Sequence, residues 1–275
     1  MIFRAYYGVP AGDPGPDGFH VNAIRGFMER LARLIAQRRP RHLAVADDED
    51  WRPDWRVELV PTYKSHRVAE PVPPGLEPQL PVIVALMAAI GVDMVGVAGH
   101  EAEDVIATWC RLAPGTIEIA SGDRDLFALV ENPRVCVLYP EKAGLAVIDE
   151  DEVARRYDIP GRRYGDFAIL RGDPSDGLPG LKGVGAVTAA GMIRRHGDIA
   201  GVLRERQLGD ADREYLEAAM RVVPPVDDLP IELPAGRRDS YPADEATMRA
   251  LAERYGVRDA CGRLASALRR LGSPR

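Results

Sequence analysis

The sequence predicts an α/β domain with a mostly parallel central sheet, followed by a helical domain. Over the first 150 residues, short apolar stretches that suit strands alternate with longer stretches that suit helices, and this order is typical of parallel sheets. Several of the apolar stretches end in acidic residues. From about residue 150 onward the pattern turns helical, without an internal repeat. We therefore expect one domain at residues 1–150 and a helical domain at residues 151–275.

Hydrophobic periodicity places the individual elements. Residues 22–37 carry apolar side chains at helical spacing, and residues 80–91 form an apolar run that Gly91 ends. Residues 48–78 are rich in proline and show little periodicity, so we expect a long functional excursion there. The expected strands lie at 42–47, 92–99 and 116–125, with a hairpin or edge pair in "RVCVLYP" and "GLAVID", and a last amphipathic helix lies at 247–270.

Composition excludes several classes of protein. No apolar run approaches the length of a membrane helix, and "MIFRAYYGVP" lacks the layout of a signal peptide. The three cysteines are scattered, which favours a reducing cytoplasm and excludes a disulfide framework. The five histidines do not have the spacing of zinc ligands. The net charge of −6 does not exclude a nucleic acid, because binding responds to the local field.

Acidic residues gather in four groups along the chain. Singly, each suits a helix cap, the first turn of a helix or a tight turn. Because the carboxyl ends of parallel strands meet at one edge of a sheet, we expect the groups to converge in space. Carboxylates about 5 Å apart repel by roughly 3 kcal/mol per pair at an effective dielectric constant near 20. The groups are Asp47, then Glu101, Glu103 and Asp104, then Asp123 and Asp125, and finally Asp173 and Asp176.

Such a gathering calls for divalent cations. Ligands that are all oxygen, without histidine or cysteine, favour Mg²⁺ or Mn²⁺ over zinc. Eight carboxylates are more than one ion can use, which suggests two ions about 3.5–4 Å apart, the arrangement that hydrolyses phosphodiesters.

The segment "LPGLKGVGAVTAAGMI" at residues 178–193 predicts a helix–hairpin–helix. Gly183 and Gly185 allow a tight hairpin whose amides, together with the start of the next helix, can face a phosphate. Lys182 adds positive charge, and Thr188 lies in the first turn of that helix. This is backbone recognition that does not read sequence. The alternative is an ordinary glycine-rich connection between helices.

Residues 51–67, "WRPDWRVELVPTYKSHR", interleave aromatic and basic side chains. Aromatic rings stack on unpaired bases and cations neutralise phosphates, a combination that suits single strands. The alternative is a solvated loop whose aromatic side chains return to the core.

Six segments occur in a familiar order: "FRAYYG", "VAD", "YKSHR", "GHEAEDVIA", "SGDRDLF" and "LRGDPSDGLPGLKGVGAVTA". In this order the chain, to about residue 230, resembles the bacterial flap endonucleases, the 5′-nuclease family that includes the N-terminal domain of DNA polymerase I. Within that family, the chain resembles the free-standing actinobacterial type. The resemblance implies a PIN-like (resolvase-like) nuclease domain with an arch at about 48–78, and a helix–three-turn–helix (SAM-fold-like) element in the helical domain.

The resemblance also implies an activity and partners. It implies a monomeric, cytoplasmic, nucleoid-associated enzyme of replication and repair that cuts DNA near single-strand/duplex junctions, using two Mg²⁺ or Mn²⁺ ions. Its substrates would be 5′ flaps, nicks, gaps and recessed 5′ ends, with RNA primer ends as a further class. The eight carboxylates named above would be metal ligands, and backbone carbonyls of the hairpin could hold K⁺.

Other residues take roles from the same resemblance. Arg4 resembles an arginine that contacts the scissile phosphate, and Lys64 would add catalytic electrostatic stabilisation. Tyr63, Lys64 and Arg67 resemble the base of the arch. The residues implied in DNA binding are Tyr63, Arg67, Lys182, Gly183, Gly185 and Thr188.

The sequence departs from the family at two places. Glu103 stands where the family commonly has aspartate. The family's opening strand, with its metal-binding aspartate, would lie before Met1, so we expect impaired metal binding and activity in this chain. That expectation keeps open a junction-binding protein without catalysis. A small-molecule phosphohydrolase using Asp123 and Asp125 is a third reading, which leaves the hairpin and the arch unexplained.

Overall fold

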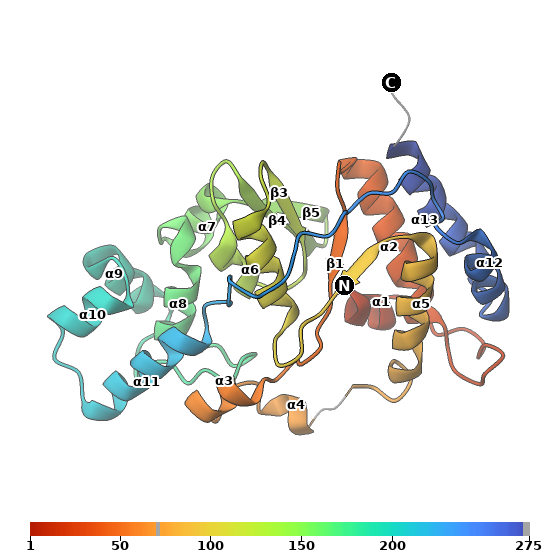
Figure 1. Ribbon diagram of the computed structural model, residues 1–275. Coiled ribbons are helices and arrows are strands. Elements are labelled where there is room, and N and C mark those ends of the chain that lie inside the picture. Colours follow the sequence, from red (N-terminus) through yellow and green to blue (C-terminus); the bar gives the residue numbers. More distant parts are fainter. Residues whose placement is uncertain (70–71, 272–275) are drawn as a thin grey trace. The chain divides into compact units, whose positions relative to one another are not determined.

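The computed structural model describes residues 1–69 and 72–271, which divide into two compact units. The first unit combines three stretches of the chain, Met1–Ala46, Glu70–Val95 and Leu233–Arg275. The second combines Asp47–Ala69 with Gly96–Glu232. These units differ from the two contiguous segments that the sequence suggests, because the chain leaves the first unit twice and returns to it (Figure 1).

The first unit is a helical layer around a short parallel strand pair. Strands β1 (Ala44–Ala46) and β2 (Asp93–Val95) pair in parallel, with Val45 opposite Met94. Phe27 and Ile35 of helix Asn22–Arg38 pack in one core with Leu86 and Leu264. The helices of this unit are α1 (Ile2–Gly8), α2 (Asn22–Arg38), the 3-10 turn η1 (Glu77–Gln79), α5 (Leu80–Ile90), α12 (Glu245–Arg254) and α13 (Arg258–Leu271).

The last two helices explain why the C-terminal segment belongs to the first unit. Helix α13 packs along α2, and α12 packs against α5 (Figure 1). Cys261, Leu264 and Leu268 of α13 are buried in the core that α2 supplies. An amphipathic helix must bury its apolar face against another element, and for α13 that element lies in the N-terminal part of the chain.

The second unit contains the other sheet. Strand β3 (Ile117–Ala120) pairs in parallel with β4 (Val135–Glu141), and β4 pairs antiparallel with β5 (Gly144–Ile148). The expected hairpin pair is thus confirmed, whereas the described strands form two separate sheets and not one. The helical elements are α3 (Asp54–Leu59), α4 (His66–Ala69), α6 (Ala102–Leu112), η2 (Asp125–Leu129), α7 (Glu150–Tyr157), η3 (Gly161–Arg163), α8 (Tyr164–Arg171), α9 (Ala186–His196), α10 (Ile199–Glu205) and α11 (Asp210–Val222).

An aromatic cluster joins this sheet to the helices that follow it. Phe127 meets Tyr139 of β4 and Tyr164 of α8 edge-on, with ring centroids 5.3 Å apart in both pairs. Tyr157 and Phe167 extend the cluster. Such pairs stabilise a core beyond the area they bury. The sheet and the helices from α7 to α11 therefore share one core.

Candidate active site

Three acidic side chains of the second unit converge. Glu103, Asp123 and Asp125 each offer a carboxylate oxygen, and these oxygens lie within 4.8 Å of one another. Glu103 is the second residue of α6, and the two aspartates follow β3. In that turn the Asp123 carboxylate accepts a 3.0 Å hydrogen bond from the amide of Asp125. The start of α6 and the turn after β3 thus bring together acids of two of the four groups, whereas we expected all four at one edge of a single sheet.

The electrostatics of the cluster disfavour three bare negative charges. Burial raises the pKa of Glu103 to about 8; Lys64 and Arg56 oppose the shift, while Glu101 and Asp123 add to it. Burial also raises the pKa of Asp125 well above its usual range, and the neighbouring Asp176 adds to that shift. The donor set is entirely oxygen, which suits a hard divalent cation. The residues present therefore fit a metal ion of that class.

Glu101 and Asp104, which flank Glu103, are engaged by the protein itself. They form a capping box at the start of α6, and the Glu101 amide donates to Asp104 Oδ2 over 3.0 Å. The buried guanidinium of Arg56 binds both carboxylates, reaching Asp104 Oδ1 at 2.6 Å from Nη2. These two acids are thus caps and ion-pair partners in this structure.

The 61–67 segment supplies further partners of Glu101. The Tyr63 hydroxyl donates to Glu101 Oε2 over 2.7 Å, and the Lys64 ammonium donates to Oε1. Arg67 Nη1 lies 3.6 Å from the same carboxylate. Glu103, Glu101 and Asp176 raise the pKa of Lys64 against the effect of its burial. Tyr63 and Lys64 are both buried, so Tyr63 supports the site from within and does not present its ring to solvent.

The remaining predicted ligands lie in different surroundings. Asp176 lies within hydrogen-bonding distance of Asp125, and its Oδ1 is 3.8 Å from Lys64 Nζ. Asp173 accepts hydrogen bonds from Arg171 over 2.9 Å and from the Ser175 amide over 3.0 Å, which makes it a turn former. Asp47 opens the second unit, where burial and Asp48 raise its pKa. Arg4 lies on α1 of the first unit, so its contact with a phosphate stays a prediction.

The glycine-rich segment forms the expected turn between helices α8 and α9. The amide of Leu181 bonds back to Leu170 at the end of α8, and Gly183 adopts a positive φ of 77°. Gly185 stands directly before α9. The side of the turn that faces solvent carries the exposed residues Lys182, Gly183, Gly185 and Thr188, with Val187 85% exposed. This side of the turn is therefore open to solvent.

Arg56 is one of the basic residues of segment 51–67, but nothing in the sequence indicates that it lies beside the acidic residues of the site. Helix α3 has six residues, which is too short for periodicity to show which face is buried. The arginine lies next to Trp55, whose ring it covers at 4.7 Å. Trp55 donates from Nε1 to the carbonyl of Gly99. This aromatic residue therefore supports the loop before α6, in line with the alternative reading of the excursion.

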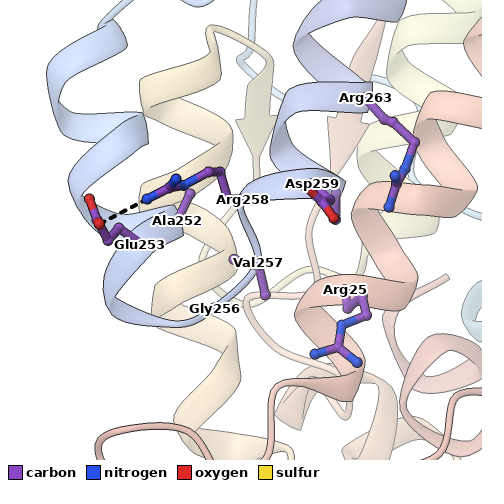
Figure 2. A pocket seen from close by; sticks show the side chains of 9 residues that line it. Arg25, Ala252, Glu253, Gly256, Val257, Arg258, Asp259 and Arg263 are labelled. Atoms are coloured by element: carbon purple, nitrogen blue, oxygen red, sulfur yellow. Dashed lines mark hydrogen bonds and ion pairs between the residues drawn. The ribbon is translucent and has the colours of Figure 1, made fainter.

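A hollow of about 510 Å³ lies elsewhere, in the first unit, among α2, α12 and α13 (Figure 2). Two of its arginines are paired: Arg258 with Glu253, and Arg263 with Glu29. It contains none of the acids or basic residues discussed above. No helix in residues 1–69 and 72–271 has the length and apolar character needed to cross a membrane.

Comparison with known proteins defines the class first. Residues 1–158 match the family model of the 5′-3′ exonuclease N-terminal, resolvase-like domain, which is more than half of the chain. The fold is therefore that of a resolvase-like, metal-dependent nuclease.

Relatives that align over nearly the whole chain show the family to which it belongs. The chain is 43% identical to a 5′-3′ exonuclease of Streptomyces coelicolor, with 98% of this chain and 97% of the relative aligned. It is 41% identical to a 5′-3′ exonuclease of Mycobacterium tuberculosis, with 98% and 95% aligned. The chain belongs to the 5′-3′ exonuclease family.

Solved structures agree on the fold. The zinc-bound T5 5′-exonuclease superposes with a TM-score of 0.65 over 99% of this chain and 96% of that one, at 14% identity. The catalytic core of Rad2 in complex with a DNA substrate gives a TM-score of 0.58 over 98% and 89%, at 17% identity.

Proposed function

We propose that this chain is a structure-specific 5′-nuclease that hydrolyses DNA phosphodiesters near single-strand/duplex junctions. Its substrates would be 5′ flaps, nicks, gaps and recessed 5′ ends, with 5′ RNA primer ends as a further class. The observation that carries the proposal is the convergence of Glu103, Asp123 and Asp125 in the unit that also holds the glycine hairpin. We propose that the enzyme acts as a monomer in the cytoplasm, at the nucleoid, in replication and repair.

The carboxylates would form two sets of ligands, one for each of two metal ions. Glu103, Asp123 and Asp125 would hold one Mg²⁺ or Mn²⁺ ion, because their oxygens already lie within 4.8 Å. Asp176 adjoins Asp125 and would contribute, with Asp173 and Asp47, to a second ion. Divalent ions at such sites neutralise phosphate charge and favour the hydroxide form of water as the attacking group.

Basic side chains would position the phosphodiester. Arg67 is the more accessible cation of the 63–67 segment, with 25% of its side chain exposed, whereas Lys64 is buried beside Glu101. We propose that Arg67 makes the first contact with a phosphate, and that Lys64 and Arg4 add charge at the scissile group. Tyr63 would hold the base of the arch through Glu101.

The hairpin would bind the duplex. Its exposed amides and Gly185, which precedes α9, can donate to phosphate oxygens, while Lys182 and Thr188 add a charge and a hydroxyl. Contacts of this kind position a duplex without reading its sequence. Carbonyl groups of the same turn could hold a K⁺ ion between protein and phosphate.

Cleavage of a 5′-flap duplex by wild-type protein and by Asp123→Asn tests the proposal. Wild type should cut in Mg²⁺, whereas Asp123→Asn should not, and both should bind the flap in Ca²⁺. Asp151→Asn changes an exposed acid of α7 and should cut like wild type. Full activity of Asp123→Asn would remove the metal assignment. Binding by wild type without cleavage would favour a junction-binding protein.

A further inference from the structure

The three acids that open α6 have unequal surroundings. The two oxygens of Asp104 accept four hydrogen bonds: Oδ1 from Arg56 Nη2 and from the Val226 amide at 2.7 Å, Oδ2 from Arg56 Nη1 at 3.1 Å and from the Glu101 amide. An ionised carboxylate offers about four lone-pair positions. Asp104 therefore has none left for a metal ion.

Glu101 is nearly as fully engaged. It accepts hydrogen bonds from Arg56, Tyr63 and Lys64, and its side chain is 3% exposed. Glu103, between them, contacts Arg56 only at 3.7 Å. The middle acid of the three is thus the one with oxygen atoms to spare.

Charge balance separates the same residues. Arg56, Lys64 and Arg67 place three positive charges beside the two negative charges of Glu101 and Asp104. Within residues 1–69 and 72–271, no ion pair joins Asp123 or Asp125 to a basic side chain. These cations make their shortest contacts with Glu101 and Asp104, and Arg56 and Lys64 reach Glu103 and Asp176 only at 3.7 and 3.8 Å. The cluster of Glu103, Asp123 and Asp125 therefore keeps its need for a cation.

Arg56 links three segments of the chain that surround these acids. Its Nε donates to the carbonyl of Val222 at the end of α11 over 3.1 Å, while the two Nη atoms bind the start of α6. Since its side chain is 0% exposed, the guanidinium fixes α3, α6 and α11 together. A planar guanidinium presents five N–H donors in a fixed fork, so it can pair with one carboxylate through two parallel bonds and still reach a second, a geometry that an ammonium does not reproduce.

We propose that Arg56 is a positioning residue that reserves Glu101 and Asp104 for the protein, so that Glu103 alone of the α6 acids serves the metal ion. The expected effect on kinetics rests on the proposed nuclease function, whereas the assignment of the metal ligands does not depend on it. It reduces the candidate metal ligands from the eight carboxylates suggested by the sequence to six, because Glu101 and Asp104 bind Arg56 and Lys64 and not the ion.

Mn²⁺ binding without DNA tests the ligand assignment. We would measure free Mn²⁺ by electron paramagnetic resonance in titrations of folded wild type, Asp104→Asn and Glu103→Gln. Affinity should fall about tenfold or more for Glu103→Gln and change less than about threefold for Asp104→Asn. Glu101→Gln should behave like Asp104→Asn. Equal losses in Asp104→Asn and Glu103→Gln would overturn the proposal.

Kinetics of Arg56→Lys test the positioning role. The lysine keeps the charge but lacks the fork of donors that pairs with Asp104 and also reaches Glu101, so kcat for flap cleavage should fall about tenfold or more while the Kd for flap DNA in Ca²⁺ stays within about twofold. Arg134→Lys is the control, because Arg134 also ties segments of this unit, through Glu131 and the Cys110 carbonyl. A purely structural role would lower Tm alike in both variants and leave kcat of the folded protein unchanged, which would overturn the proposal.

The two measurements separate the proposal from the proposed function. If wild type binds Mn²⁺ but cuts no flap, the nuclease assignment of this chain fails, and the Mn²⁺ series still decides which α6 acids are ligands. If wild type cuts and Arg56→Lys cuts equally well, the nuclease stands and the role of Arg56 is refuted.

Discussion

Arg56 and Asp104 face each other through two parallel contacts, 2.6 Å between Nη2 and Oδ1 and 3.1 Å between Nη1 and Oδ2, and neither side chain is exposed to solvent. Paired contacts of this geometry are the strongest that a carboxylate makes in proteins. Buried as they are, both charges depend on each other, because neither can be solvated by water.

The first prediction concerns the stability of this pair. Arg56→Met should lower the free energy of unfolding by about 3–5 kcal/mol, since it leaves Asp104 buried without its counter-charge. The double variant Arg56→Met/Asp104→Asn should lose less than the sum of the single changes, because it removes both charges together. Urea unfolding at pH 7 in EDTA measures both. Additive losses would contradict the coupling of these residues.

The second prediction concerns Gly177, which lets the 61–64 segment approach the turn that carries Asp173 and Asp176. A Cβ at this position would lie 1.8 Å from the carbonyl oxygen of Thr62, and the φ of +68° is strained for any other residue. Gly177→Ala should therefore destabilise the protein by more than about 1 kcal/mol.

The same change should also displace Lys64, whose amide bonds to the Asp176 carbonyl over 2.9 Å. Thermal unfolding and flap cleavage check the two effects. Gly115→Ala is the matched control, because its φ is +83° but the added Cβ would meet open space. Equal losses of Tm in both variants would show that backbone strain alone explains the effect.

Much of this fold and part of its site follow from the sequence. The sequence predicts a helix at 22–37 and strands at 42–47, 92–99 and 116–125. The structure has these elements at 22–38, 44–46, 93–95 and 117–120, so each expected strand is longer than the observed one. The sequence also predicts that Glu103 lies near Asp123 and Asp125. The reason it gives, one shared sheet edge, differs from the structure, where β2 and β3 belong to separate sheets.

Long-range polar partners do not follow from the sequence. Arg56 and Asp104 are 48 residues apart, and nothing in the periodicity of α3 or α6 pairs them. For the same reason the amphipathic pattern of 247–270 predicts a buried face without saying that α2 covers it. The single helix expected there is two helices, α12 and α13, separated by a turn at Gly256 with a positive φ of 64°. The three acids of α6 look alike in the sequence, and their neighbours in space make them different.

The third prediction follows from the raised pKa of Glu103, about 8 in the folded chain against 4.5 for an ordinary glutamate. The folded state holds this proton more tightly than the unfolded state, so without divalent metal the free energy of unfolding should fall as the pH rises from about 5 to 8 and level off above that. Mg²⁺ should restore stability most strongly near pH 8, because binding must release the proton.

Urea unfolding at several pH values, in EDTA and in Mg²⁺, measures this dependence. Glu103→Gln mimics the protonated side chain, so its stability in EDTA should depend less on pH, with Asp125 supplying what remains of the slope. A wild-type protein whose stability in EDTA rises between pH 5 and 8 would contradict the assignment.

The fourth prediction tests the hairpin as a duplex-binding element. Lys182 is exposed beside Gly183, so Lys182→Ala should weaken the binding of duplex DNA of any sequence and reduce the slope of log K against log salt by about 1, the contribution of one phosphate contact. Lys142→Ala removes an exposed lysine from the turn between β4 and β5 and serves as the control. Binding isotherms in Ca²⁺ at several salt concentrations give both slopes. If the two lysine variants share the wild-type slope, the duplex does not contact this hairpin through Lys182. A drop confined to one DNA sequence would instead mean that the side chain reads bases, because phosphate contacts are the same on every duplex.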